Sequence, residues 1–145
     1  MSTIGVLARS GLLKPAGPRS VARLAATLAA WGATPAAGYA SAAALTPDRA
    51  ALIDEAGSLT FREVESRTNA LARLLSAEGV DESSQIGILA RNHRGFAEAT
   101  VAAWKLGAGV VFLNTSFAGP QLRDAARGEG ISLVIHDAEF AEQVS

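Results

Sequence analysis

Three short apolar runs, separated by two helical patterns, constrain the fold of this 145-residue chain more than any other feature. The runs cover 85–90, 109–113 and 131–135, and continuous apolar runs of this length are typical of strands buried in a parallel sheet. The patterns between them predict helices over 94–106 and 121–127. This strand–helix–strand–helix–strand order predicts right-handed crossovers and a parallel sheet that helices cover on both faces.

Glycine and proline residues mark where these elements begin and end. Gly107 follows the first helical pattern, Pro120 stands in the first turn of the second, and Gly128 and Gly130 follow it. Ala138 begins a further helical pattern at the end of the chain. A sheet of three parallel strands exposes an edge where a next strand would pair, so we predict an incomplete βαβαβ layer.

Ahead of the sheet, the sequence predicts a small hairpin and then an amphipathic helix. Segments 50–54 and 58–60 flank a turn at 55–57. Thr60 and Glu63 have the spacing of a capping box, in which each side chain accepts a hydrogen bond from the other residue's backbone N–H. The helix is predicted to end at Gly79. Its predicted inward residues are Val64, Leu71, Leu74 and Leu75, and its predicted outward residues are Arg62, Glu65, Arg67 and Arg73.

Residues 1–45 differ in composition from the rest of the chain. The first fifty residues contain fifteen alanines, and 24–47 carries no charge. We favour a short amphipathic helix followed by a mobile linker, because apolar residues recur at helical spacing. That stripe consists of Val21, Leu24, Ala25, Leu28 and Trp31. We therefore divide the chain into an alanine-rich leader, 1–45, and a partial α/β domain, 46–145.

Two other interpretations of the leader stay open. The uncharged segment 24–47 is long enough for a membrane-spanning helix, but Gly32, Pro35 and Gly38 interrupt it. A secretory signal would use Arg19 and Arg23 as its charged flank and 40–42 as its cleavage site. We expect a cytoplasmic chain and leave peripheral membrane contact of the weakly basic leader open.

The composition excludes several classes of function. The formal net charge is −1 and 19% of the residues are charged, without the basic excess that marks nucleic-acid binders. Cysteine is absent, which removes disulfides, thiol nucleophiles and cysteine metal sites. The two histidines are too few and too far apart for a metal cluster.

In an open parallel sheet, a ligand site lies beyond the carboxyl ends of the strands, so the residues there are the candidates. After the first strand, His93 could act as an acid–base group or bind an anion with Arg94 at a helix N-terminus. We favour a structural interpretation, in which Asn92 caps the helix while His93 and Arg94 are solvated or packed. After the third strand, His136 and Asp137 are predicted to cap the next helix.

The remaining candidates also favour structural roles. Asn114 suits a turn, and Ser116 lacks a nearby His–acid pair that would activate it. The glycine-containing segment 105–109 leads from a helix into a strand, which is the reverse of the order that aims backbone donors at phosphate. Two carboxylate pairs, Asp54 with Glu55 and Glu63 with Glu65, are interpreted as solvated. From the residues alone, no catalytic, cofactor-binding or metal-ligating position is assigned.

The order of five segments resembles the opening of adenylate-forming (AMP-binding) enzymes, and most closely bacterial fatty-acyl-CoA synthetases. The resemblance covers about 45–140 and is carried by 59–64, 69–80, 85–96, 105–122 and 133–137. It implies that the fold is a part of the large N-terminal α/β domain of such an enzyme. The arginine- and alanine-rich composition is typical of a high-GC actinobacterium.

The family's reaction uses ATP and a carboxylate to form an acyl-adenylate, which coenzyme A then converts to the thioester. Mg²⁺ would offset the phosphate charge. The resemblance places the family's phosphate loop, adenine- and ribose-binding residues, hinge and catalytic lysine downstream of the segments matched here. It therefore carries no catalytic residue onto this sequence, and we expect no acyl-CoA formation by the chain alone.

Three hypotheses about function follow. The first is an N-terminal fragment of an ATP-dependent fatty-acid–CoA ligase. The second is a non-catalytic module that binds an acyl chain, or that pairs with a synthetase or with itself through the open sheet edge. The third, an unrelated receiver-like or flavodoxin-like protein, is disfavoured, because Asn92 and Asn114 stand at strand ends where a receiver needs acidic residues.

Overall fold

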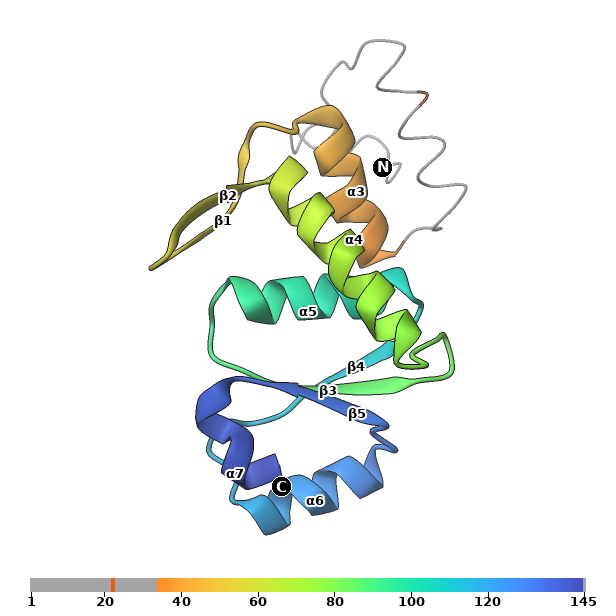
Figure 1. Ribbon diagram of the computed structural model, residues 1–145, viewed down its shortest axis with the longest axis vertical. Coiled ribbons are helices and arrows are strands. Elements are labelled where there is room, and N and C mark those ends of the chain that lie inside the picture. Colours follow the sequence, from red (N-terminus) through yellow and green to blue (C-terminus); the bar gives the residue numbers. More distant parts are fainter. Residues whose placement is uncertain (1–21, 23–33, 145) are drawn as a thin grey trace, which may run out of the picture.

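A parallel sheet of three strands lies between two helical layers (Figure 1). The computed structural model describes residue 22 and residues 34–144. The strands are β3 (Gln85–Leu89), β4 (Gly109–Phe112) and β5 (Leu133–His136), in the order β4-β3-β5. The expected α/β fold with a parallel sheet is confirmed, and β3 is its central strand.

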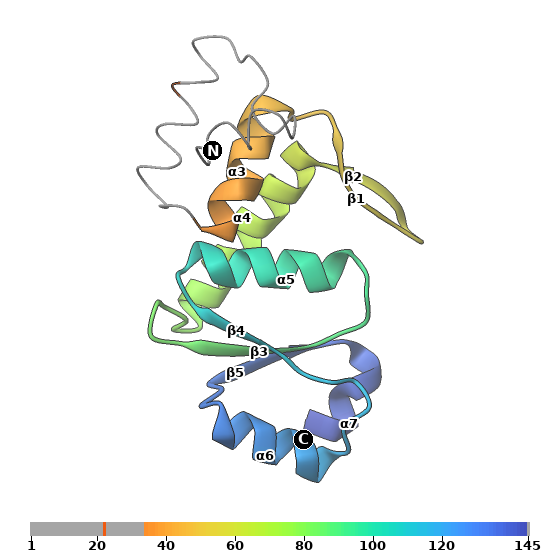
Figure 2. The ribbon, with the colours of Figure 1, turned by 180° about the vertical axis from the view of Figure 1, so that it is seen from behind.

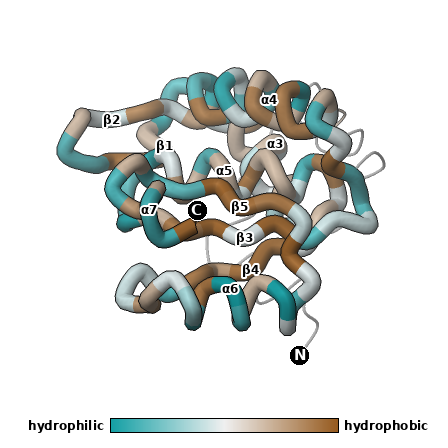
Figure 3. Tube along the Cα trace, turned by 60° about the horizontal axis from the view of Figure 1, so that its bottom comes forward, coloured by the Kyte–Doolittle hydropathy of each residue, from teal (hydrophilic) through white to brown (hydrophobic). Residues whose placement is uncertain are grey.

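The helices α4 (Phe61–Ala77) and α5 (Arg94–Lys105) cover one face of the sheet, and α6 (Gly119–Gly128) and α7 (Ala141–Val144) lie on the other (Figures 1 and 2). A 3₁₀ turn, η1 (Ala138–Phe140), precedes α7. Seen from the side of α6 and α7, the strands form a mostly hydrophobic band between more polar helices (Figure 3). This pattern follows from burial of the strands on both faces.

The core consists of two clusters, one on each face of the sheet. On the α5 face, Ile86 and Ile88 are 0% and 1% exposed and pack against small residues of α5. On the other face, Leu89 and Leu113 pack with Leu122 and Phe140. The alanines that α5 presents to the sheet, Ala99, Ala102 and Ala103, are all buried.

The predicted hairpin and capping box are confirmed. Strands β1 (Ala50–Asp54) and β2 (Gly57–Thr60) pair antiparallel, with Gly57 at a positive φ of 105°. Glu63 N donates to Thr60 Oγ1 over 3.3 Å, and Thr60 N donates to Glu63 Oε2 over 2.7 Å. Helix α4 therefore begins where the sequence predicts.

The predicted inward face of α4 is partly wrong. Leu74 is 65% exposed, while the buried positions are Val64, Thr68, Ala72 and Leu75. Thr68 is accommodated because its hydroxyl donates to Val64 O over 2.8 Å. This small, fully buried side chain is therefore satisfied within its own helix.

The linker predicted before the hairpin is in fact a helix. Helix α3 (Pro35–Leu45) packs against α4 and α5, with Ala36 and Ala37 buried. Thr34 Oγ1 accepts from Ala37 N over 3.3 Å, and Pro35 stands in the first turn, where its missing N–H costs nothing. The amphipathic stripe of 21–31 and its charged flank lie outside the described residues, except for Ala22. The domain boundary at residue 45 stays a prediction.

A buried lysine joins α4 to α5. Lys105 Nζ lies 2.8 Å from Glu65 Oε2 and 2.6 Å from Asn69 Oδ1, and its side chain is 1% exposed. Burial lowers the pKa of Lys105, and its contacts with Glu65 oppose this shift. Glu65, predicted to be solvated, is thus a partner within the fold, and Lys105 is not available to a phosphate.

No helix in the described part of the chain is long and apolar enough to cross a membrane. Helix α3 of the leader has eleven residues and continues through Gly38.

Two isoleucines provide a matched test of the core. Replacing fully buried Ile86 by Ala is expected to lower the free energy of unfolding by about 2–5 kcal/mol, because the substitution removes apolar contact and leaves a cavity. The same substitution at Ile53, which is 79% exposed, is expected to change it by less than about 0.5 kcal/mol. Urea denaturation followed by circular dichroism measures both values. Equal losses at the two positions would contradict the assigned core.

Candidate functional site

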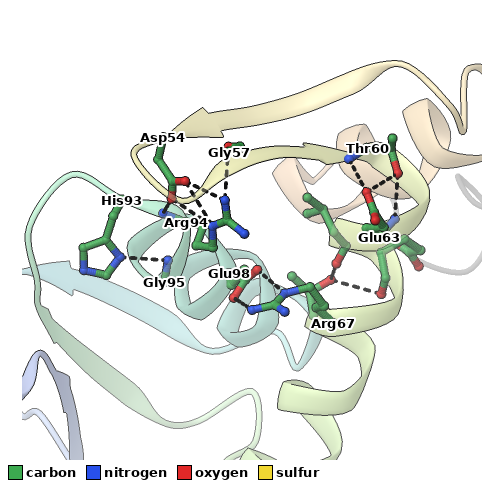
Figure 4. Close-up of polar contacts among 12 residues, drawn as sticks. Asp54, Gly57, Thr60, Glu63, Arg67, His93, Arg94, Gly95 and Glu98 are labelled. Atoms are coloured by element: carbon green, nitrogen blue, oxygen red, sulfur yellow. Dashed lines mark hydrogen bonds and ion pairs between the residues drawn. The ribbon is translucent and has the colours of Figure 1, made fainter.

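The carboxyl ends of β3 and β5 and the N-terminus of α5 meet at one end of the sheet. Around this point, the structure brings together the side chains of His93, Arg94 and Asp137 and the backbone N–H of Arg91, and Asp54 from the hairpin joins them. Figure 4 shows Asp54, His93 and Arg94 at the start of α5. We define these five residues as the strand-end cluster.

The strongest contact in this cluster is the ion pair between Asp54 and Arg94. The Arg94 guanidinium donates to Asp54 Oδ1 over 2.6 Å and to Oδ2 over 2.9 Å. The Arg94 backbone N–H also donates to Asp54 Oδ2 over 2.9 Å, and Nη2 reaches Gly57 O. The two side chains are only 13% and 21% exposed, so the prediction that Asp54 is solvated was wrong.

This pairing changes the electrostatics of Asp54. The side-chain hydrogen bonds from Arg94, followed by the bond from its backbone N–H, hold the pKa of Asp54 far below its ordinary value. The same contacts raise the pKa of Arg94. Asp54 is therefore a fixed anion at the N-terminus of a helix, the position that otherwise attracts phosphate.

His93 is the residue that caps α5, which corrects the prediction of Asn92 at that position. Its Nδ1 accepts from Gly95 N over 3.0 Å, and its Nε2 lies 2.9 Å from Asp137 Oδ1. A neutral imidazole with its hydrogen on Nε2 makes both contacts at once. A Cβ at position 95 would lie 2.7 Å from His93 Cε1, so glycine leaves room for the ring.

Asp137 links the ends of β3 and β5. Its Oδ2 accepts from Arg91 N over 2.8 Å while its Oδ1 contacts His93. Burial acts to raise the pKa of Asp137. The hydrogen bonds with Arg91 and His93 act in the opposite direction and outweigh burial, so the pKa of Asp137 lies below its ordinary value. Asp137 precedes η1 but makes no side-chain cap there, so its predicted capping role was wrong.

Arg91 and His136 are occupied by neighbouring groups. The Arg91 guanidinium makes two 3.0 Å hydrogen bonds to the carboxylate of Glu139 and lies 5.2 Å from the ring centroid of Phe140. His136 Nδ1 lies 2.9 Å from Asp137 O. These contacts secure η1 against the end of β3.

The other candidates lie elsewhere and have structural partners. Asn114 Oδ1 accepts from Ser116 N over 2.9 Å, which forms a turn after β4. No residue other than glycine has a positive φ within the described segments, so Asn114 does not adopt the left-handed conformation. The carboxylate of Glu63 is occupied in the capping box.

A shallow cavity of about 230 Å³ lies beside the strand-end cluster. Its lining combines apolar and charged residues, namely Leu52, Ile53, Asp54, Asn92, His93, Arg94 and Phe96. The acidic and basic groups here already pair with each other. Within the described residues, no group of three or more His, Cys, Asp or Glu side chains could hold a metal ion.

Sequence reasoning found His93, Arg94 and Asp137 but missed their partners. Asp54 and Arg94 lie 40 positions apart in the sequence, and His93 and Asp137 lie 44 apart. No local pattern indicates such pairs. The only general rule that applies is that the carboxyl ends of parallel strands meet at one edge of the sheet. This rule does not predict that Asp54, a residue of the hairpin, lies at the same edge.

The AMP-binding enzyme family matches residues 39–145. Over 101 residues, the chain is 28% identical to the 3-oxocholest-4-en-26-oate–CoA ligase of Rhodococcus rhodochrous, and the match covers 70% of this chain and 18% of the relative. It is 33% identical over 103 residues to a feruloyl-CoA synthase of an Amycolatopsis species, covering 71% and 21%. The chain thus spans about a fifth of the length of these curated relatives.

The fold has a counterpart among solved structures. The O-succinylbenzoate coenzyme A synthetase of Bacillus subtilis, in complex with ATP and a magnesium ion, superposes with a TM-score of 0.69 and 28% sequence identity. The superposition covers 72% of this chain and 29% of the synthetase. Since the family match spans most of the chain and the same α/β layer recurs in a solved member, the chain belongs to the AMP-binding enzyme family and corresponds to the N-terminal part of adenylate-forming enzymes.

Proposed function

We propose that this chain supplies the N-terminal scaffold of an ATP-dependent ligase that joins a hydrophobic carboxylic acid, of the fatty-acid class, to coenzyme A. The observation that carries the proposal is the family match over residues 39–145. The relatives support an acid substrate, because they are named as CoA ligases for a sterol-derived acid and for ferulate. The fatty-acid class is supported by the sequence resemblance and by relatives that are named as medium/long-chain-fatty-acid–CoA ligases.

The N-terminus of α5 does not fit the phosphates of ATP. A phosphate site at a helix N-terminus needs free backbone N–H groups. At α5, however, the N–H groups of Arg94 and Gly95 already donate to Asp54 and His93. We therefore assign no step of the reaction to the strand-end cluster, and we propose that it acts as a structural joint.

The proposal predicts that the purified 145-residue chain exchanges no pyrophosphate into ATP. A panel of fatty acids and aromatic acids with Mg²⁺ and ATP is expected to give background rates. The N–H groups at the α5 N-terminus are occupied, and the described residues contain no group that could hold a metal ion. The O-succinylbenzoate synthetase with its own acid serves as the positive control. Acid-dependent exchange by this chain would contradict the assignment of a scaffold.

A test of the ligase assignment itself lies in the gene. The reading frame or a neighbouring one is expected to encode a Ser/Thr/Gly-rich loop ending in Pro-Lys-Gly downstream of the matched region. If neither frame encodes such a loop, the assignment to an ATP-dependent ligase is contradicted, and the hypothesis of a non-catalytic module is favoured.

The structural role of the strand-end cluster predicts a defined pH dependence for Asp54→Asn. The lowered pKa of Asp54 means that its ion pair stabilises the fold fully above the unfolded-state value, about 4, and that this contribution is lost as pH falls below it. The variant is expected to unfold at lower urea than the wild type at pH 7. The difference in urea midpoint between the variant and the wild type should become smaller as the pH falls below about 4.

Asp48→Asn is the matched control, because Asp48 also pairs with an arginine but is 83% exposed. It is expected to change the urea midpoint little at pH 7. An Asp54→Asn midpoint as high as that of the wild type would show that the ion pair does not hold the hairpin to α5.

A further inference from the structure

Within the described residues, one edge of β4 has a defined set of backbone groups that no other strand pairs. Gly109 N donates to Ser84 O and Leu113 N donates to Ile88 O, both over 2.9 Å. Because alternate residues of a strand in a parallel ladder bond to opposite sides, Val110 and Phe112 direct their N–H and C=O groups away from β3. In the described part of the chain, β3 is the only strand that pairs with β4.

This edge strand is short, but it lacks the other features by which proteins prevent strand addition. Those features include a lysine, a proline or a bulge on the edge strand. The residues of β4 after Gly109 are all apolar, and its register with β3 is regular. Phe112 is 54% exposed, and its ring lies 5.0 Å from that of Phe96 on the α5 side of the sheet.

The other edge strand, β5, differs in its residues. By the same alternation, Asp137 N donates to Leu89 O, so Val134 and His136 face away from β3. The polar ring of His136 contacts Asp137 O at this edge, and no large residue of β5 is among the strongly exposed ones. The two edges therefore offer a matched comparison within one sheet.

We propose that two copies of this chain associate through their β4 edges. An antiparallel pair with its two-fold axis at Val111 places Val110 of each copy opposite Phe112 of the other. Both residues face outward, so each of the two opposed pairs exchanges two hydrogen bonds. The same surface then serves on both copies, as a two-fold dimer requires.

The side chains also match in this arrangement. Val110 and Phe112 are two positions apart, so their side chains lie on the same face of the strand. Val110 of one copy then lies against the exposed Phe112 of the other, and aromatic with β-branched pairs stabilise antiparallel strands. The edge is four residues long, which suits a small interface and a weak, reversible dimer. This association does not depend on the ligase assignment.

Sedimentation velocity of the full chain over a wide concentration range tests the proposal. The wild type is expected to shift reversibly from monomer to dimer. Val110→Pro removes an N–H that faces away from β3, and Phe112→Lys places a charge at an exposed edge position. Each is expected to weaken dimerisation by at least about tenfold, the equivalent of about 1.4 kcal/mol.

Val134→Pro is the matched control, because it removes the corresponding outward N–H from β5. It is expected to leave the dimer constant unchanged, while circular dichroism confirms that all three variants are folded. Four results would overturn the proposal: a wild type that stays monomeric throughout, open-ended aggregation, a dimer that both β4 variants retain, or a dimer lost in Val134→Pro alone.

Amide hydrogen exchange provides a second, local measurement. Exchange at Val110 and Phe112 is expected to slow as the protein concentration rises, whereas exchange at Leu113, already bonded to Ile88, is expected to stay constant. Protection that appears at Val134 in place of Val110 would assign the contact to β5 and contradict the proposed edge.

Discussion

The first backbone N–H groups of α5 have no acceptor within the helix, and this requirement organises the strand-end cluster around them. Asp54 accepts from the N–H of Arg94, and the imidazole of His93 accepts from that of Gly95. The same two acceptors bind outward, Asp54 to the Arg94 guanidinium and His93 to Asp137. The N-terminus of α5 thus connects the hairpin and the end of β5 to this helix.

Features that depend on neighbouring residues could be predicted from the sequence, and features that depend on distant contacts could not. The capping box joins residues three positions apart, and each strand of the sheet corresponds to one continuous apolar run of the sequence. The pairs Asp54–Arg94 and His93–Asp137 connect segments 40 and 44 positions apart. Nothing local distinguishes Asp54 from the solvated Glu55 beside it.

The errors in α3 and α4 have a common physical cause, which is close packing by small residues. Hydrophobicity favours Leu74 as a core position, yet α4 turns Thr68 and Ala72 toward its neighbours and leaves Leu74 65% exposed. In α3, Ala36 and Ala37 are buried despite their small apolar area. A glycine within a helix costs roughly 1 kcal/mol relative to alanine. Packing of α3 on α4 and α5 offsets that cost at Gly38.

The contacts within the strand-end cluster support our proposal that these residues carry no step of the family's chemistry. Function resides in sites that are built on a fold, and one fold can hold different sites or none. Here the sheet offers the usual location, the carboxyl ends of parallel strands, but Asp54 and Asp137 fill the anion positions at that edge. An incoming phosphate would have to displace a bidentate ion pair and a helix cap together. The carboxylates that stabilise this end of the sheet therefore occupy backbone N–H groups that an anion would otherwise use.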